Sequence, residues 1–176
     1  KQTGLTAMAG HVRRFNPGHQ WVHQGIQAGR LHLQQIQAHT YFFRRKNMNA
    51  LGAPRSWIDH LLWHHACHTV DMFIYQTGDV PEQIYGVEGP HHPELGIAMD
   101  LAIIMKAKNG AVCTLSTSFN NDGPIGSPYR YICDNGPYIA SMSAIDTQSA
   151  TQFLARNKAA VWAANQSAQR SVPVSR

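Results

Sequence analysis

The sequence lacks acidic residues in two of its three parts. Residues 1–58 contain eight Lys or Arg and no Asp or Glu, and residues 147–176 contain four Lys or Arg and no acid. All ten acids lie in residues 59–146, so the net charge of +5 hides an uneven distribution. An acid-free front third indicates an anionic partner or substrate, because clustered positive charge attracts anions. A basic surface without any ligand is the alternative.

Other absences exclude whole classes of protein. No apolar run reaches the ~18 residues of a transmembrane helix, and the first residues contain no apolar signal core. None of the three cysteines belongs to a CxxC pair, which favours a cytoplasmic protein with thiols that behave as small buried hydrophobes. Lys and Arg do not alternate with aromatics in a nucleic-acid motif, so we expect no nucleic-acid partner. There is no GxGxxG and no GxxxxGK[ST], so the chain has no nucleotide-binding loop of its own.

The 176 residues, 43% of them hydrophobic, are sufficient for one globular domain. A helix is expected over 18–28, between Asn16-Pro17 and Gly29, and a second from Ser56 to Gly78. Strands are expected at 5–15, 31–45, 83–87, 98–107, 111–119, 129–133 and 138–140. Because five strands follow one another at the end, we predict an α+β fold whose mixed, largely antiparallel sheet carries its helices on one face.

The composition changes after residue 140. Residues 141–176 are rich in Ala, Ser, Gln and Asn, and contain no acid after Asp146. We therefore predict a domain over 1–140 and a tail over 141–176 that is a frayed helix or disordered.

The second helix contains the most distinctive cluster, with four of the eleven histidines. His64, His68 and Asp71 have the spacing i, i+4 and i+7, which places them on one helical face together with His60. His65 points elsewhere. Three hypotheses remain open: a metal site, an acid–base site, or histidines that only pack.

Each hypothesis corresponds to a different class of protein. Two His at i, i+4 can bind zinc, as in a histidine-rich metal-dependent hydrolase, although no HExxH or CxxC accompanies them. A His of near-neutral pKa is the natural proton shuttle of an enzyme. Packed histidines would fit a ligand-binding or structural module without catalysis.

An Arg-Arg-Phe-Asn-Pro segment stands before the first helix, and the second helix carries His68-x-x-Asp71. Together with three further segments, these two resemble the C-terminal domain of the Gfo/Idh/MocA oxidoreductases. The family helix usually reads Asp-x-x-x-His-x-x-Asp, and here His64 replaces its first Asp. The segments are GHVRRFNP (10–17), TYFFRRKNMNALG (40–52), RSWIDHLLWHHACHTVD (55–71), LGIAMD (95–100) and SFNNDGP (118–124).

The resemblance implies a partner domain as well as a reaction. Family members begin with a Rossmann domain that carries the Gly-rich loop and a catalytic Lys in a Glu-Lys-Pro motif, and neither is in this sequence. This chain is therefore expected to be the substrate-binding and oligomerisation half of a dehydrogenase, with NADP or NAD bound mainly by another domain. The implied reaction oxidises a cyclic hemiacetal dicarboxylate, formed by aromatic ring cleavage, to a pyrone. The sheet faces of the family commonly pair subunits, which implies a homodimer.

The resemblance also implies roles for individual residues. His68 matches the catalytic His and His64 the polar position that assists it, whereas Asp71 is expected to be structural and Arg14 to pack. Arg13 matches a substrate-contacting position, and arginines suit a dicarboxylate because their planar cations bind carboxylates in pairs of hydrogen bonds. Further substrate-binding candidates at strand ends and loops are Arg44, Arg45, Asn47, Asn120 and Asn121.

Overall fold

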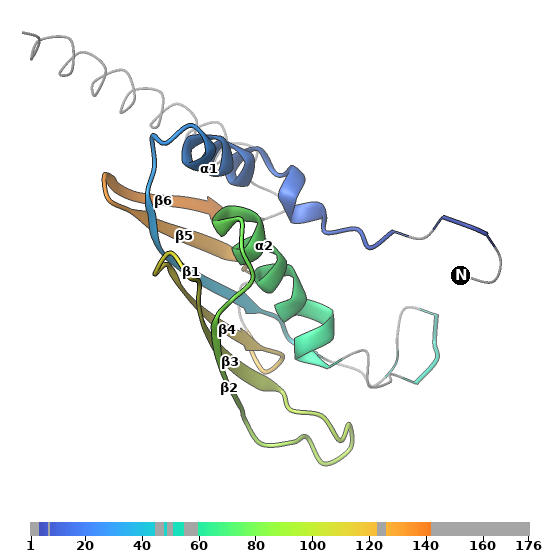
Figure 1. Ribbon diagram of the computed structural model, residues 1–176. Coiled ribbons are helices and arrows are strands. Elements are labelled where there is room, and N and C mark those ends of the chain that lie inside the picture. Colours follow the sequence, from blue (N-terminus) through green and yellow to red (C-terminus); the bar gives the residue numbers. More distant parts are fainter. Residues whose placement is uncertain are drawn as a thin grey trace, which may run out of the picture.

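The computed structural model describes residues 4–6, 8–44, 48, 51–54, 60–122 and 126–141. Two helices cover one face of a six-stranded sheet (Figure 1). The helical elements are η1 (Val12–Phe15), α1 (Pro17–Gln27), η3 (Leu62–Ala66) and α2 (Cys67–Thr77). The strands are β1 (Leu33–Tyr41), β2 (Gln83–Glu88), β3 (Asp100–Lys106), β4 (Val112–Ser118), β5 (Pro128–Cys133) and β6 (Gly136–Ser141).

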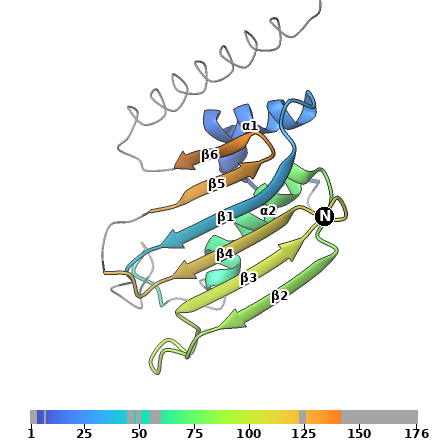
Figure 2. The same cartoon turned by 90° about the vertical axis from the view of Figure 1, so that its left-hand side faces the viewer.

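The strands lie in the order β2-β3-β4-β1-β5-β6, as Figure 2 shows. Strands β1 and β4 are parallel, and every other neighbouring pair is antiparallel. The predicted α+β fold, with a mixed and largely antiparallel sheet under helices on one face, is confirmed.

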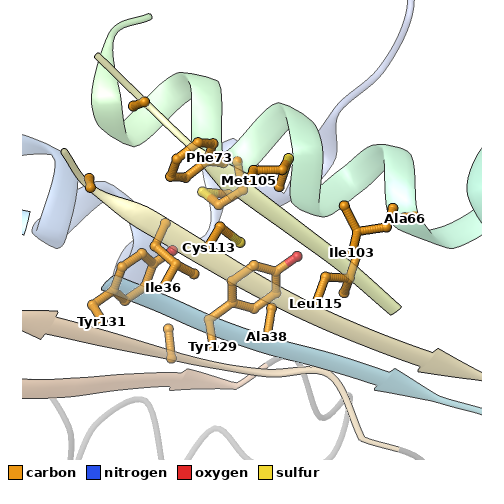
Figure 3. Packing of buried hydrophobic residues seen from close by; sticks show 14 of the residues in the cluster. Ile36, Ala38, Ala66, Phe73, Ile103, Met105, Cys113, Leu115, Tyr129 and Tyr131 are labelled. Atoms are coloured by element: carbon orange, nitrogen blue, oxygen red, sulfur yellow. The ribbon is translucent and has the colours of Figure 1, made fainter. Parts of the chain in front are cut away.

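The core lies between this sheet and the two helices. In β3, β4 and β5 alternate residues are buried toward the helices, as Leu101, Ile103 and Met105 are in β3. Figure 3 shows Tyr129 and Tyr131 of β5 pointing the same way, into one cluster with Phe73 of α2. The three cysteines are free; Cys113 and Cys133 are buried and Cys67 is half-buried.

Local sequence explains where the helices begin and end. The Asn16 side chain accepts the backbone N–H of Gly18 at 2.9 Å and of His19 at 3.4 Å, and Pro17 follows as the first helical residue. Gly78 ends α2 in the left-handed conformation, with φ of 74°. Both predicted helix ends are confirmed.

The strand predicted over 5–15 is wrong. Residues 12–15 form the 3-10 helix η1, and the described residues before it form no strand. Leu5 and Met8 are 81% and 89% exposed. A strand needs neighbours for its ladder of hydrogen bonds, and no described strand pairs with this segment.

The second helix differs from an ordinary α-helix where the histidines lie. Its described part begins with a π-helix, η3, in which the backbone N–H of Cys67 reaches the carbonyl of Leu62 five residues earlier. This wider turn runs directly into α2. The predicted start over 55–59 and the tail beyond Ser141 lie outside the described residues.

Candidate active site

Basic side chains from η1, η3 and the first turn of α2 gather where these three elements meet. η1 packs against α2, and η3 continues into it and contacts β4. The predicted residues Arg13, His64 and His68 all belong to these elements. Their chemistry depends on which of the charges are already paired within the chain.

Arg14 is fully engaged with Asp71 of α2. Its Nε donates to Oδ2 of Asp71 at 2.8 Å and its Nη2 to Oδ1 at 2.5 Å. The carboxylate raises the pKa of Arg14, and the guanidinium also lies 5.0 Å from the ring centre of Tyr75. This two-bonded ion pair fastens η1 to α2.

Arg13, the next residue, is buried and has no carboxylate partner among the described residues. It is only 7% exposed. Its guanidinium donates to the hydroxyl of Tyr129 and, at 3.5 Å, to Oγ of Ser127. A buried cation that meets only neutral hydroxyls is costly unless an anion completes its surroundings. Arg13 therefore suits a negatively charged ligand group.

His68 lies beside this cation on α2. Burial, followed by the charges of Arg13 and His11, lowers the pKa of His68 below its ordinary value of 6.5. The ring of His11 meets it edge-on, with 5.8 Å between the ring centres. The buried Nδ1 of His68 has no hydrogen-bond partner among the described residues. A neutral imidazole of this kind can accept a proton at neutral pH.

His64 and His65 form a second pair on η3. Nδ1 of His64 lies 3.1 Å from Nε2 of His65, so one ring donates and the other accepts. His65 stacks on Phe42 with 4.5 Å between ring centres and meets Phe119 edge-on at 5.2 Å. Burial, followed by the neighbouring His64, lowers the pKa of His65 to about 3. His65 is thus neutral and holds the more exposed His64.

Arg44 joins the same aromatic cluster from the end of β1. Its guanidinium carbon lies 3.7 Å from the ring centre of Phe119, and its charge also contributes to the low pKa of His65. The structure therefore brings Arg44 near the histidines. Arg45 and Asn47, the next predicted contacts, lie outside the described residues.

Asn120 and Asn121 lie elsewhere. Nδ2 of Asn120 donates to Oδ2 of Asp100 at 2.7 Å, and Asp100 alternates along β3 with residues that face the helices. Both asparagines line a shallow groove of about 590 Å³, on the face of the sheet turned away from His68. His60 is also apart, because its Nε2 lies 3.2 Å from Oε1 of Glu88 on β2.

Three contributors to this arrangement were not identified from the sequence: Tyr129, Thr69 and His65. The alternating pattern of its strand predicts only a core position for Tyr129. The one sign of a further role is that a buried Tyr hydroxyl needs a hydrogen-bond partner. His65 was placed on another helical face, which neglects the wider turn of η3.

Two further observations concern the described residues as a set. Among them, no three His, Cys, Asp or Glu side chains lie close enough together to hold a metal ion. None of the described helices is long and apolar enough to cross a membrane.

Comparison with known proteins adds a sequence relationship. Residues 17–154 match the family described as "Bacterial oxidoreductases, C-terminal". Over 140 residues, the chain is 64% identical to the 4-carboxy-2-hydroxymuconate-6-semialdehyde dehydrogenase of Sphingobium sp. (strain NBRC 103272 / SYK-6). This alignment covers 80% of the chain but 44% of the relative, so the chain spans less than half of that protein's length.

Solved structures share the fold at low sequence identity. A putative myo-inositol dehydrogenase from Sinorhizobium meliloti 1021 matches with a TM-score of 0.63 and 17% identity, over 79% of this chain and 43% of that one. The WlbA dehydrogenase from Bordetella pertussis, solved with NADH and UDP-GlcNAcA, matches with a TM-score of 0.63 and 14% identity, over 76% of this chain and 42% of that one. These likenesses show the fold alone.

Proposed function

Because the chain belongs to the family of C-terminal domains of bacterial oxidoreductases, we propose that it is the substrate-binding half of an NADP-dependent dehydrogenase. Family membership confirms the resemblance to the Gfo/Idh/MocA oxidoreductases. The proposed reaction oxidises the hemiacetal of 4-carboxy-2-hydroxymuconate semialdehyde to 2-pyrone-4,6-dicarboxylate, a step in the catabolism of protocatechuate. The 64% identity to the Sphingobium dehydrogenase supports this choice of substrate.

The observation that carries the proposal is the contrast between Arg13 and Arg14. Arg14 is neutralised by Asp71, whereas the buried Arg13 has no anion among the described residues. A substrate carboxylate would supply the missing anion, and the low dielectric around a buried guanidinium would strengthen the contact between them. The charge of Arg13 already reaches His68, so the bound carboxylate and the proton acceptor are neighbours.

The residues of this chain have the following roles in the proposed reaction. His68, neutral at pH 7, accepts the proton of the hemiacetal hydroxyl, and the nicotinamide, when bound, would take the hydride from the carbon. His64 assists from η3 in the orientation that His65 gives it. Arg13 and Arg44 bind the substrate carboxylates. Arg45, Asn47, Asn120 and Asn121 remain sequence predictions, and the two asparagines lie across the sheet from His68.

The described residues do not fit the phosphates of a dinucleotide. Such phosphates bind free backbone amides at a helix N-terminus. The first amides of α1 are occupied by the Asn16 side chain, and α2 continues from η3 without a free N-terminus. We therefore assign the NADP or NAD to another domain, and derive no catalytic step through it.

Exposed apolar side chains suggest where other parts of the enzyme pack. Val12 and Phe15 of η1 are 60% and 73% exposed, beside the candidate site. The cofactor-binding half would cover them. The face of the sheet turned away from α1 and α2 is the proposed homodimer surface, in line with the pairing of sheet faces in the family. We place the enzyme in the cytoplasm.

A chimera tests the function directly. The chain replaces the corresponding segment of the Sphingobium relative, and formation of reduced nicotinamide is followed with 4-carboxy-2-hydroxymuconate semialdehyde. We expect turnover with either NADP or NAD. His68→Ala should lower kcat by roughly 100-fold or more, and Arg13→Gln should raise KM by about tenfold or more. Full turnover of a folded His68→Ala chimera would refute the assignment of the proton acceptor.

A further inference from the structure

The hydroxyl of Tyr129 lies at the junction of the three elements that build the candidate site. Tyr129 belongs to β5 and is fully buried. Its hydroxyl accepts a hydrogen bond from Nη1 of Arg13, in η1. The same oxygen lies 2.6 Å from Oγ1 of Thr69, in α2, which is also fully buried. Figure 3 shows the hydroxyl of Tyr129 pointing toward the helical layer.

The position of Thr69 makes this contact relevant to His68. Thr69 follows His68 directly in α2, so a bond to Thr69 fixes the helical turn that carries the imidazole. A bond to Arg13 fixes the guanidinium. One phenol oxygen therefore links the buried cation to the helical turn that carries the imidazole.

We propose that Tyr129 is a positioning residue that holds the Arg13 guanidinium beside His68, in the orientation in which it meets an anionic group of the substrate. The inference rests on the proposed function for the identity of that anion. The placement of Arg13 relative to His68 does not depend on the proposed function.

Tyr131 provides an internal comparison for this role. It lies two residues further along β5, faces the same way and is also fully buried. The two rings stack with 6.3 Å between centres. The hydroxyl of Tyr131, however, lies 2.7 Å from Nδ1 of His19 and forms no hydrogen bond with an arginine of the described residues. Removing either hydroxyl disturbs the same core, but only one removal releases Arg13.

The groups around His68 define what a displaced Arg13 would change. Arg13 and His11 face it from the segment of η1 and lower its pKa, as His64 does from its own helix. Asp71, also on that helix, raises the pKa. If Arg13 turns away, the largest charge that lowers the pKa is lost while Asp71 stays in place. The pKa of His68 should then rise.

The experiment compares Tyr129→Phe with Tyr131→Phe in the 176-residue chain. The pKa of His68 is measured by NMR titration of its ring, assigned with His68→Ala. Affinity for 2-pyrone-4,6-dicarboxylate is measured by calorimetry. We expect Tyr129→Phe to raise the pKa of His68 by about half a pH unit and to weaken binding roughly tenfold. Tyr131→Phe should change neither, and Arg13→Gln sets the upper limit of both effects.

Thr69→Val supplies a second route to the same answer if Tyr129→Phe does not fold. It keeps the shape of the side chain, removes its hydroxyl, and should move the pKa of His68 in the same direction. Equal values for wild type and for folded Tyr129→Phe or Thr69→Val would overturn the proposal. Absence of dicarboxylate binding by the wild-type chain, with the pKa of His68 still raised in Tyr129→Phe, would count against the proposed substrate and support the positioning role.

Discussion

At the scale of single residues, burial decides which histidines of this chain can carry a proton. His19 lies fully buried between Tyr129 and Tyr131, with 4.9 Å and 5.8 Å between ring centres. Burial, followed by the charge of Arg13, lowers the pKa of His19 to about 4. His68 is less buried than His19, and its pKa is also lowered. It is neutral near pH 7 and remains able to accept a proton.

The pKa of His19 predicts acid sensitivity of the fold. In the unfolded chain His19 has its ordinary pKa of 6.5, so between pH 6.5 and 4 the unfolded state binds one more proton than the folded state. Stability from this group is complete above pH 6.5 and falls as the pH drops toward 4. Lowering the pH from 7 to 5 should therefore reduce the free energy of unfolding by about 2 kcal/mol.

Urea unfolding at the two pH values measures this loss. His19→Gln should be less stable at pH 7, but its pH 7 to pH 5 difference should be smaller than that of wild type by about 2 kcal/mol. His91→Gln, at a largely exposed position, should leave the wild-type difference unchanged. If His19→Gln shows the same pH dependence as wild type, His19 does not carry the effect.

The residues of the site could be predicted from the sequence only where they belong to short local motifs. Arg13 and His68 stand in short motifs, and the structure brings them together. Tyr129 is 116 residues from Arg13 in the sequence, and only the strand order places its hydroxyl there. Asn120 was predicted from its place in a loop after a strand, but Phe119 and Asn120 point to opposite faces of the sheet, and the sequence does not say which face adjoins the histidines.

At the scale of elements, the contact between α1 and the chain that follows it depends on a residue without a side chain. A Cβ on Gly25 would come within 2.6 Å of Cδ1 and 2.8 Å of Cγ of Leu31. Leu31 is buried in the core, 4% exposed, so it has little room to move. Ala favours a helix over Gly by up to about 1 kcal/mol, but overpacking costs about 1–3 kcal/mol.

We therefore expect Gly25→Ala to lower the unfolding free energy by about 1–2 kcal/mol. Gly10→Ala is the control, since no atom lies within 4 Å of the Cβ it would gain, and its stability should stay within about 0.5 kcal/mol of wild type. Chemical denaturation of the three proteins measures both changes. An increase in stability for Gly25→Ala would mean that Leu31 adjusts freely.

The start of the first helix, the end of the second and the two β-hairpins rested on strong local signals, and the structure confirms them. Asn16-Pro17 begins α1, Gly78 ends α2, and turns with Asn-Gly join β3 to β4 and β5 to β6. The π-helix η3 leaves no such signal, because its residues also fit a 3.6-residue period. The strand predicted over 5–15 failed because an apolar run does not reveal whether a partner strand exists.

At the scale of the whole molecule, the described helices cover one face of the sheet, and no other described element covers the opposite face. The face turned away from α1 and α2 exposes large apolar side chains near both edges. Tyr85 and Val87 of β2 are 66% and 71% exposed, Ile104 of β3 is 50% exposed, and Ile139 of β6 is 47% exposed. Tyr85 and Ile104 are paired across β2 and β3, so the residues of this edge lie together, and apolar patches exposed to water mark interaction surfaces. A second copy of the chain, bound by the same face, would cover it with the symmetry that most homodimers use.

Sedimentation of the 176-residue chain tests this dimer. We expect a dimer at concentrations of about 10 μM, since a sheet face can bury the ~1,200–2,000 Å² typical of stable interfaces. Ile104→Glu should give a monomer, because two copies of the change would place like charges within the apolar contact. Val80→Glu alters another exposed apolar residue, 61% exposed, in the loop after α2, and should remain dimeric. A monomeric wild-type chain at about 100 μM, or a dimer of Ile104→Glu as stable as wild type, would refute a homodimer through this face. Since His68 and Arg13 lie on the covered side of the sheet, the Ile104→Glu monomer should still bind 2-pyrone-4,6-dicarboxylate, and the dimer contact and the candidate active site can be measured separately.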